Sequence, residues 1–268
     1  MNGRLRPLLT SLLISVAALL TGSLRAEVDS TLTADLAISS FPGRLEASGE
    51  ASFLNHYVWR GIRVTDGAVM QPSLSLGLGD FSFNAWGNLD MDDVNGSKGR
   101  INEVDYTLDY SFQLKNLGLS LGLIEYTFPN TAVKSTTELY WSISADKIFS
   151  PSFSVYKDID ESDGLYLSLG FGHGVALEWI SSRLEFYGAL GWGSSGNNSF
   201  YYGVGKSAAT DVSFGVGMPF ELFGKMTVSS RVGYLGLLAG NIRKSAGKKD
   251  HFTFGLSVSS SYSYPELR

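Results

Sequence analysis

Apolar residues recur at every second position through most of the chain from about residue 45 onward, which is the period of a β-strand and not of a helix. The clearest run is EVDYTLDYSFQL at residues 103–114, where all twelve positions alternate. One face carries Val104, Tyr106, Leu108, Tyr110, Phe112 and Leu114, and the other carries Glu103, Asp105, Thr107, Asp109, Ser111 and Gln113. This segment is therefore predicted to be a strand with one apolar and one polar face.

The same alternation returns along the chain, and clusters of Gly, Asn, Asp, Ser and Pro separate its runs. The predicted strands lie at about residues 47–60, 70–78, 81–92, 103–114, 117–123, 137–146, 152–160, 165–172, 184–192, 211–218, 226–234 and 252–260. They number about twelve, and 10 or 14 also fit the pattern. The pattern predicts no helix after the N-terminal segment.

The composition of the two faces distinguishes a membrane barrel from a soluble sandwich of two sheets, whose strands also alternate. The polar faces are rich in Gly and Ser, charge rarely interrupts the apolar faces, and aromatic residues such as Tyr57, Trp59, Tyr126 and Trp192 gather near strand ends. In a bilayer, strands can cross only as a closed sheet. We predict an all-β fold, a transmembrane antiparallel up-and-down β-barrel. A secreted soluble β-protein and a fibre or adhesin module are the alternatives.

The N-terminal segment has the order of a secretory signal peptide. Arg4 and Arg6 precede an apolar run from Leu8 to Leu20, and small and polar residues lead to Ala26. An uncleaved anchor helix is the alternative. The expected organisation is a signal peptide at 1–26, a periplasmic tail or partial plug at 27–44, the outer-membrane barrel at 45–264 and a C-terminal tail at 265–268.

Charge and composition limit the classes of partner that this protein can bind. Removing residues 1–26 takes three of the 21 basic residues and no acid, which leaves 18 basic against 26 acidic residues and a net charge of −8. Such a chain is a poor candidate for binding nucleic acid. With no cysteine, disulfides, thiolate metal sites and a lipid-anchored lipoprotein are excluded. The expected partners are the outer-membrane bilayer, the barrel-assembly machinery and small solutes or cations, and the oligomeric state is open.

Residues 55–93, NHYVWRGIRVTDGAVMQPSLSLGLGDFSFNAWGNLDMDD, resemble the opening of TorF-type porins and related uncharacterised bacterial outer-membrane barrels. In that family an aromatic-rich Tyr-x-[Trp/Phe]-Arg-Gly element is followed by Thr-Asp-Gly and a Gln-Pro or Gln-Gly strand start. INEVDYTLDYSF, GLIEYTFPN and SPSFSVYKDIDESDGLYLSLGFGH look like later parts of the same family. The resemblance covers about residues 50–240. It implies a bacterial barrel and a porin, and it transfers neither a substrate nor catalytic residues.

If the apolar face points outward, many acids point into the barrel. The inward acids are Asp90, Asp92, Glu103, Asp105, Asp109, Glu138, Asp146, Asp158, Asp160 and Glu185, and the chief inward bases are Arg60 and Arg231. Carboxylates around a water-filled pore concentrate cations and repel anions. We therefore predict a narrow diffusion channel that favours cations or small neutral solutes. The alternative is that these acids pair with bases inside a plugged barrel.

Two local features leave alternatives open. Arg60-Gly61 followed by Thr65-Asp66-Gly67 fits a constriction or loop-anchoring arginine that reaches an inward carboxylate. It also fits simple turn chemistry, with Asp66-Gly67 supplying the positive φ of a hairpin. Lys157 falls on the lipid-facing parity of its strand, so we expect it at a strand end or the alternation reversed there.

An enzymatic function is not expected. The three histidines, His56, His173 and His251, lie near predicted strand ends, and the chain has no Gly-x-Ser-x-Gly, no metal-spaced His pair and no phosphate loop. No catalytic residue, metal site or cofactor is predicted. The alternatives are a non-conducting structural or surface-interaction barrel and, beyond that, a lipid-modifying enzyme. Predicted gaps between strands are mostly short, the longest being about 194–209 and 238–249, which favours a channel over a surface receptor.

Overall fold

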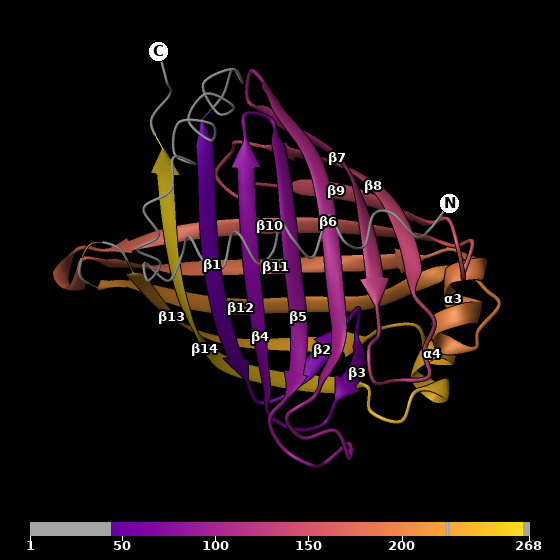
Figure 1. The fold of residues 1–268 in the computed structure, drawn as a ribbon. Helices are drawn as coiled ribbons and strands as arrows, with labels where there is room; N and C mark the ends of the chain where they lie inside the picture. Colours follow the sequence, from indigo (N-terminus) through magenta and orange to yellow (C-terminus); the bar gives the residue numbers. More distant parts are fainter. Residues whose placement is uncertain (1–43, 223, 225, 265–268) are drawn as a thin grey trace, which may run out of the picture. The chain divides into compact units, whose positions relative to one another are not determined.

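Twelve antiparallel strands close into a barrel in the computed structural model, which describes residues 44–222, 224 and 226–264 (Figure 1). The strands are β1 (Leu45–Leu54), β4 (Val69–Leu78), β5 (Phe81–Asp90), β6 (Ile101–Leu114), β7 (Leu117–Thr127), β8 (Thr136–Ala145), β9 (Ser152–Asp158), β10 (Leu165–Leu177), β11 (Ser182–Gly193), β12 (Ala208–Leu222), β13 (Met226–Leu237) and β14 (Asp250–Tyr264). The predicted fold class is confirmed. The predicted signal peptide, the predicted periplasmic tail or partial plug up to residue 43 and the tail at 265–268 lie outside the described residues.

Closure leaves the main sheet without an edge. β1 pairs with β4 on one side and with β14 on the other, over its whole length from Leu45 to Leu54. Each other strand of the barrel pairs with its neighbours along the chain. Every strand can therefore satisfy its backbone N–H and C=O groups within the sheet, which a bilayer requires. Among the described residues, no helix is long and apolar enough to cross a membrane.

The outer face is apolar. Leu121, Leu139, Phe214 and Phe254 are each more than two fifths exposed although they lie in the middle part of their strands. A closed barrel has no second layer to cover such side chains, so they face lipid. Aromatic rings gather near the strand ends, as in the Phe81–Tyr110 pair with ring centroids 4.8 Å apart.

Lys157 lies at a strand end, as predicted. It is paired in register with Leu139 and Leu165, two outward residues, and is one residue from the end of β9. Its ammonium donates to the carbonyl oxygen of Asp163 over 2.8 Å and forms an ion pair with the carboxylate of the same residue. The long side chain therefore carries its charge off the lipid-facing surface, as snorkelling lysines do.

The two ends of the barrel differ. At the turn end, where β1 begins, the connections are short, such as residues 79–80 and 115–116. At the loop end the connections are 55–68, 91–100, 128–135, 159–164, 194–207 and 238–249. Figure 1 shows β2 (Tyr57–Trp59), β3 (Ile62–Thr65), α3 (Ser195–Tyr202) and α4 (Gly240–Ser245) gathered at the loop end. Short turns at one end and longer loops at the other are typical of outer-membrane barrels.

The prediction that no helix follows the N-terminal segment was wrong, because α3 and α4, and the 3₁₀ helix η1 (Glu178–Ile180), occupy connections. The sequence of α3, SGNNSFYY, has no apolar period that would announce a helix. The Ser194 side chain caps it by accepting from the Asn197 backbone N–H, and Gly203, with φ +67°, ends it. Tyr202 then packs with Leu237 and Ile242 in a buried cluster. Such short helices depend on tertiary packing more than on propensity.

Candidate functional site

The connection between β1 and β4 folds into a two-stranded hairpin of its own. β2 and β3 pair from Tyr57 to Thr65, with Trp59 opposite Ile62 and only Arg60 and Gly61 between them. Both turn residues have positive φ, 45° and 77°, as the type I′ hairpin turn requires. The positive φ of this hairpin therefore lies at Arg60-Gly61.

The prediction that Asp66-Gly67 supplies the positive φ was therefore wrong. Gly67 does not take a positive φ. A Cβ atom at Gly67 would lie 2.0 Å from the carboxylate of Asp92, whose Oδ2 accepts from the Ala68 backbone N–H over 2.8 Å. The glycine leaves room for this carboxylate beside the backbone, and the turn does not demand it.

The hairpin lies against the inner wall of the barrel. The Tyr57 ring contacts Trp86 of β5, with centroids 5.5 Å apart, and the Trp59 ring contacts Tyr126 of β7 at 6.2 Å. The Thr65 hydroxyl donates to Asp90 over 3.0 Å, and both side chains are buried. The hairpin therefore narrows the lumen at the loop end.

Arg60, at the tip of the hairpin, binds the wall residue Glu138. Its two terminal nitrogens donate to the two carboxylate oxygens over 2.8 and 2.7 Å, and both side chains are buried. Tyr126 also donates its hydroxyl to this carboxylate over 2.9 Å. Burial by itself lowers the pKa of Arg60, but the charge of Glu138 outweighs it and raises that pKa above its usual value. The arginine stays charged and anchors the loop, and it also forms the hairpin turn that the turn interpretation had placed at Asp66-Gly67.

Aromatic rings enclose the same guanidinium. The Arg60 Cζ atom lies 4.0 Å from the ring centroid of Tyr166, 4.3 Å from that of Trp59 and 5.0 Å from that of Tyr156. These distances are within the range of cation–π attraction, which is strongest where water is excluded. The backbone carbonyl of Arg60 accepts from the Tyr202 hydroxyl over 2.8 Å, which ties the tip to α3.

Two of the predicted inward acids hold loops. Asp90 accepts from Thr65 and, over 3.0 Å, from Asn102. Asp158 accepts from the Thr136 hydroxyl over 2.9 Å and from the backbone N–H groups of residues 160, 161 and 162. Both are buried. Asp90 and Asp158 therefore stabilise the connections at the loop end.

Three other predicted acids line the wall without a basic partner. Within the described part of the chain, Glu103, Asp105 and Asp109 take part in no ion pair. Asp109 accepts from the hydroxyls of Tyr140 and Ser111, while one buried carboxylate oxygen of Asp105 has no hydrogen-bond partner. These three carboxyl groups therefore have no basic partner in the described part of the chain.

The remaining predicted residues divide between the wall and its surroundings. Glu185 accepts from Arg183 over 2.6 Å. Gly217 of β12 is in register with Glu185 on one side and with Arg231 on the other, so Arg231 faces the same side of the sheet as Glu185. Asp146 and Asp160 are exposed in connections outside the wall, because β8 ends at Ala145 and β9 at Asp158. Alternation read from sequence ran past both strand ends.

Sequence reasoning missed the inward aromatic residues and Asp211. Asp211 is buried and accepts from the Tyr166 hydroxyl over 3.1 Å and from the Thr210 hydroxyl over 2.6 Å. A signal was present, since Tyr140, Tyr156 and Tyr166 all fall on the polar parity of their strands. A large aromatic ring among Ser and Gly on the inward face indicates a position where the ring packs against another residue inside the barrel.

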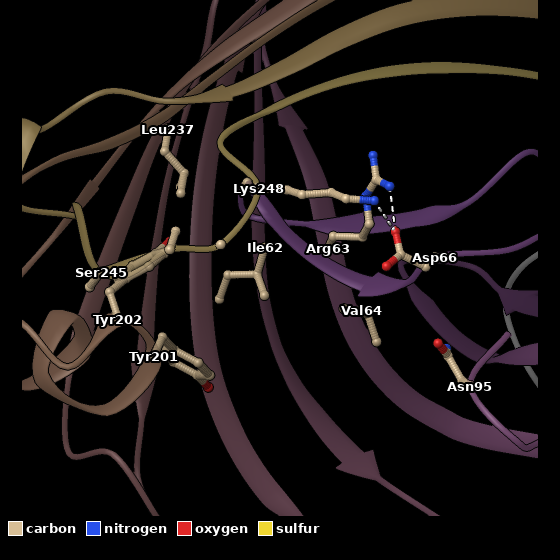
Figure 2. Close-up of a pocket in the computed structure, with 13 residues that line it drawn as sticks. Ile62, Arg63, Val64, Asp66, Asn95, Tyr201, Tyr202, Leu237, Ser245 and Lys248 are labelled. Atoms are coloured by element: carbon tan, nitrogen blue, oxygen red, sulfur yellow. Dashed lines mark hydrogen bonds and ion pairs between the residues drawn. The ribbon is translucent and has the colours of Figure 1, made fainter. Parts of the chain in front are cut away.

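A second polar cluster lies at the mouth of the loop end, beside a cavity of about 510 Å³ between the hairpin and the 238–249 connection. Figure 2 shows Arg63 and Lys248 both pointing at Asp66, and Lys248 donates to it over 2.8 Å. Hydrogen bonds from Arg63 and then Lys248 lower the pKa of Asp66 to about 2. Arg63 also donates to His251 over 3.2 Å.

His56 is buried beside this cluster, with its ring centroid 6.1 Å from that of His251, and its Nε2 has no hydrogen-bond partner. Burial, and after it the charge of Arg63, lowers the pKa of His56 to about 4. His56 is therefore neutral at pH 7. Within the described residues there is no group of three or more metal-ligating side chains.

Comparison with known proteins places the fold. The KdgM porin superposes with a TM-score of 0.51 at 9% identity, covering 80% of this chain and 99% of the porin. The fold is that of an outer-membrane β-barrel. The KdgM porin in complex with disordered oligogalacturonate gives 0.51 at 8% identity, covering 81% and 99% of the two chains, and the NanC porin gives 0.48 at 11% identity, covering 81% and 98%. No protein-family model and no curated protein sequence matches the chain. The TorF-type resemblance stays a prediction.

Proposed function

We propose that this protein is an outer-membrane channel for small solutes, with a lumen that prefers cations and a hairpin that narrows the loop end. Two observations support this proposal. The barrel is closed and has an apolar outer face. On its wall, Glu103, Asp105 and Asp109 have no basic partner in the described chain. The proposal includes export through a cleaved signal peptide and insertion by the barrel-assembly machinery.

The electrostatics support cation preference. Fixed carboxylates in a confined pore with low-dielectric walls raise the local concentration of cations and repel anions. Arg60 does not offset this effect, since Glu138 neutralises it through two hydrogen bonds, and Arg231 is then the one other predicted inward base. The same reasoning disfavours an acidic oligosaccharide as the solute of this chain, whatever the KdgM porin accommodates.

The wall near the turn end supports passage of water and solutes. A cavity of about 290 Å³ is lined by residues of β1, β4, β13 and β14, almost all of them small, namely Ser48, Gly49, Glu50, Ser73, Ser75, Thr227, Ser259, Ser260 and Ser261. Small hydroxyl side chains leave space for water and offer it hydrogen bonds. The narrow part of the bore is therefore at the loop end, around Arg60.

Single-channel recording in a KCl gradient tests the proposal. We expect a cation-selective reversal potential and a lower selectivity in Asp109→Asn. Asp146→Asn is the matched control, because it removes the same charge from an exposed turn outside the wall. Anion preference, or selectivity equally reduced by the control, would overturn the cation-preferring lumen.

The seated hairpin favours a second candidate, a non-conducting barrel that serves as a structural or surface-interaction anchor. The two are distinguished by recording from correctly folded wild type and from Arg60→Ala, with folding checked by heat-modifiable gel mobility. Zero conductance in both would establish the anchor and remove the channel. Recovery of the protein in the soluble periplasm would remove both, and release of fatty acid from labelled phospholipid would indicate an enzyme instead.

A further inference from the structure

The groups that hold the Arg60 guanidinium come from the barrel wall, whereas Arg60 itself comes from the hairpin. Glu138 of β8 binds both terminal nitrogens, Tyr126 of β7 donates to the same carboxylate, and Tyr156 of β9 and Tyr166 of β10 present their rings. We call these four wall residues the wall site. It is a carboxylate between aromatic faces, which is the chemistry that recognises an organic cation.

The shape of the wall site depends little on Arg60. Its members lie on four successive strands whose ladders hold the backbone, and Tyr156 is in register with Tyr166. The Tyr126 hydroxyl orients Glu138, and the Tyr166 hydroxyl is held by Asp211 over 3.1 Å. The ring of Tyr156 is also stacked on that of Tyr140, with centroids 5.6 Å apart. Because contacts within the wall position these side chains, the site would persist if the hairpin tip withdrew.

We infer that the wall site binds solutes bearing a guanidinium group and that Arg60 occupies it as a tethered competitor. The inference rests on the proposed channel function and names the solute class of its constriction. A planar guanidinium places two N–H groups on the two oxygens of Glu138 while its faces stack on tyrosine rings. A compact ammonium is a point charge that cannot do both, so the geometry favours guanidinium over ammonium.

The tether has a measurable consequence. A group held on a short loop competes at an effective concentration of about millimolar or more. A free guanidinium solute therefore has to exceed that level in the wild type, and it then releases the tip from Glu138. The hairpin keeps its other contacts, including the Thr65 bond to Asp90. In Arg60→Ala the competitor is gone, and the space it leaves matches a small alkylguanidinium.

The test uses the full barrel in detergent with ethylguanidinium chloride as the probe, kept to millimolar concentrations, and ethylammonium and tetramethylammonium chlorides as controls. We expect ethylguanidinium to raise the Tm of Arg60→Ala and to block its current. Half-saturation should occur at a concentration at least tenfold lower than in wild type, and at least tenfold lower than in Arg60→Ala/Glu138→Gln, which lacks the charged acceptor.

If Arg60→Ala does not fold alone, the readout becomes its folded yield, measured by heat-modifiable mobility after refolding with and without ethylguanidinium. Recovery by ethylguanidinium and not by the two ammonium salts supports the wall site. Equal responses in the presence and absence of Glu138, or equal responses to guanidinium and ammonium, overturn it. A rise in Tm without any current keeps the site and removes the channel, while a current without guanidinium selectivity keeps the channel and removes the site.

Discussion

Arg60 and Glu138 are 78 positions apart in the chain and meet inside the barrel through two parallel hydrogen bonds of 2.8 and 2.7 Å. One residue comes from the tip of a hairpin and the other from the wall, so this pair determines where the hairpin lies. Only 8% of the Arg60 side chain and 2% of the Glu138 side chain are exposed. The seating of the hairpin therefore depends on a buried ion pair, and removing one partner of such a pair is costly.

Replacing one member of this pair should destabilise the barrel. We expect Arg60→Ala or Glu138→Ala each to lower the free energy of unfolding by about 3–5 kcal/mol, because each leaves an uncompensated buried group. The double variant should cost less than the sum of the two. Arg183→Ala is the control, since its pair with Glu185 is exposed and worth at most about 1 kcal/mol. Urea unfolding in detergent measures all four, and strictly additive costs would show that the pair does not act as a unit.

Gly61 should not tolerate a side chain. Its φ is +77°, and a Cβ atom would lie 2.6 Å from a methyl group of Leu237. We expect Gly61→Ala to cost about 1–2 kcal/mol from the backbone conformation and about 1–3 kcal/mol more from overpacking. Gly96→Ala is the matched control, with φ +71° and no atom within 4 Å of the added Cβ. Tm values in the same detergent compare the two, and equal losses would mean that the tip moves freely away from Leu237.

The stability of the loop end should depend on pH through His56. Its pKa in the folded protein is about 4, against about 6.5 in an unfolded chain. Between these values the unfolded chain binds the extra proton, so the stabilisation is complete above pH 6.5 and is lost as the pH falls toward 4. The groups that face His56 are Arg63, His251, Asp66 and Lys248. We expect His56→Gln to weaken the pH dependence of the unfolding midpoint between pH 6.5 and 4. An unchanged pH dependence would assign the effect to another group.

Asp66 acts in a different pH range, which allows the two effects to be separated. Its pKa of about 2 lies below the usual 3.8, so its contribution is present above about pH 4 and is lost between about pH 4 and 2. Asp66→Asn should therefore change the lower range. A larger change above pH 5 would mean that Asp66 acts through His56.

The outer face should reject charge in a depth-dependent way. Leu121 lies at the middle of β7 and is 54% exposed, whereas Phe81 is the first residue of β5 at the turn end. We expect Leu121→Arg to cost about 2–4 kcal/mol in lipid vesicles and Phe81→Arg about 0–1 kcal/mol. Folding equilibria in vesicles measure both. Equal costs would indicate that the bilayer does not cover the middle of this face.

Alternation was enough to predict the barrel because it is read from neighbouring residues and yet determines which face of the whole sheet each side chain lies on. The alternation in residues 103–114 predicts a strand with one apolar and one polar face. About twelve such strands have to close into a barrel, because in lipid every backbone N–H and C=O group needs a hydrogen-bond partner within the sheet. The helix α3 could not be predicted in the same way. Its polar residues show no period, and the contact of Tyr202 with Ile242 comes from a connection about forty residues away.

The candidate site was visible only in part. Parity predicted the acids and Arg231 on the wall strands and the strand end at Lys157, but it also included Asp146 and Asp160, which lie in connections, and Arg60, which lies in a hairpin turn. Which acid Arg60 binds did not follow, because ten acids shared the inward list and nothing local distinguishes Glu138 from Asp105. The tyrosines of the wall site lay on the polar parity but were not recognised as a group until their strands were in register.

The sequence by itself determined the strand period and the closed antiparallel barrel, since both follow from which residues alternate along each strand. Tertiary structure alone decided that the hairpin lies inside the barrel, that Glu138 neutralises Arg60 and that Glu103, Asp105 and Asp109 have no basic partner in the described chain. These are relations between side chains on different strands. Their distances depend on how many strands close the barrel and on the register between them, which no local pattern encodes.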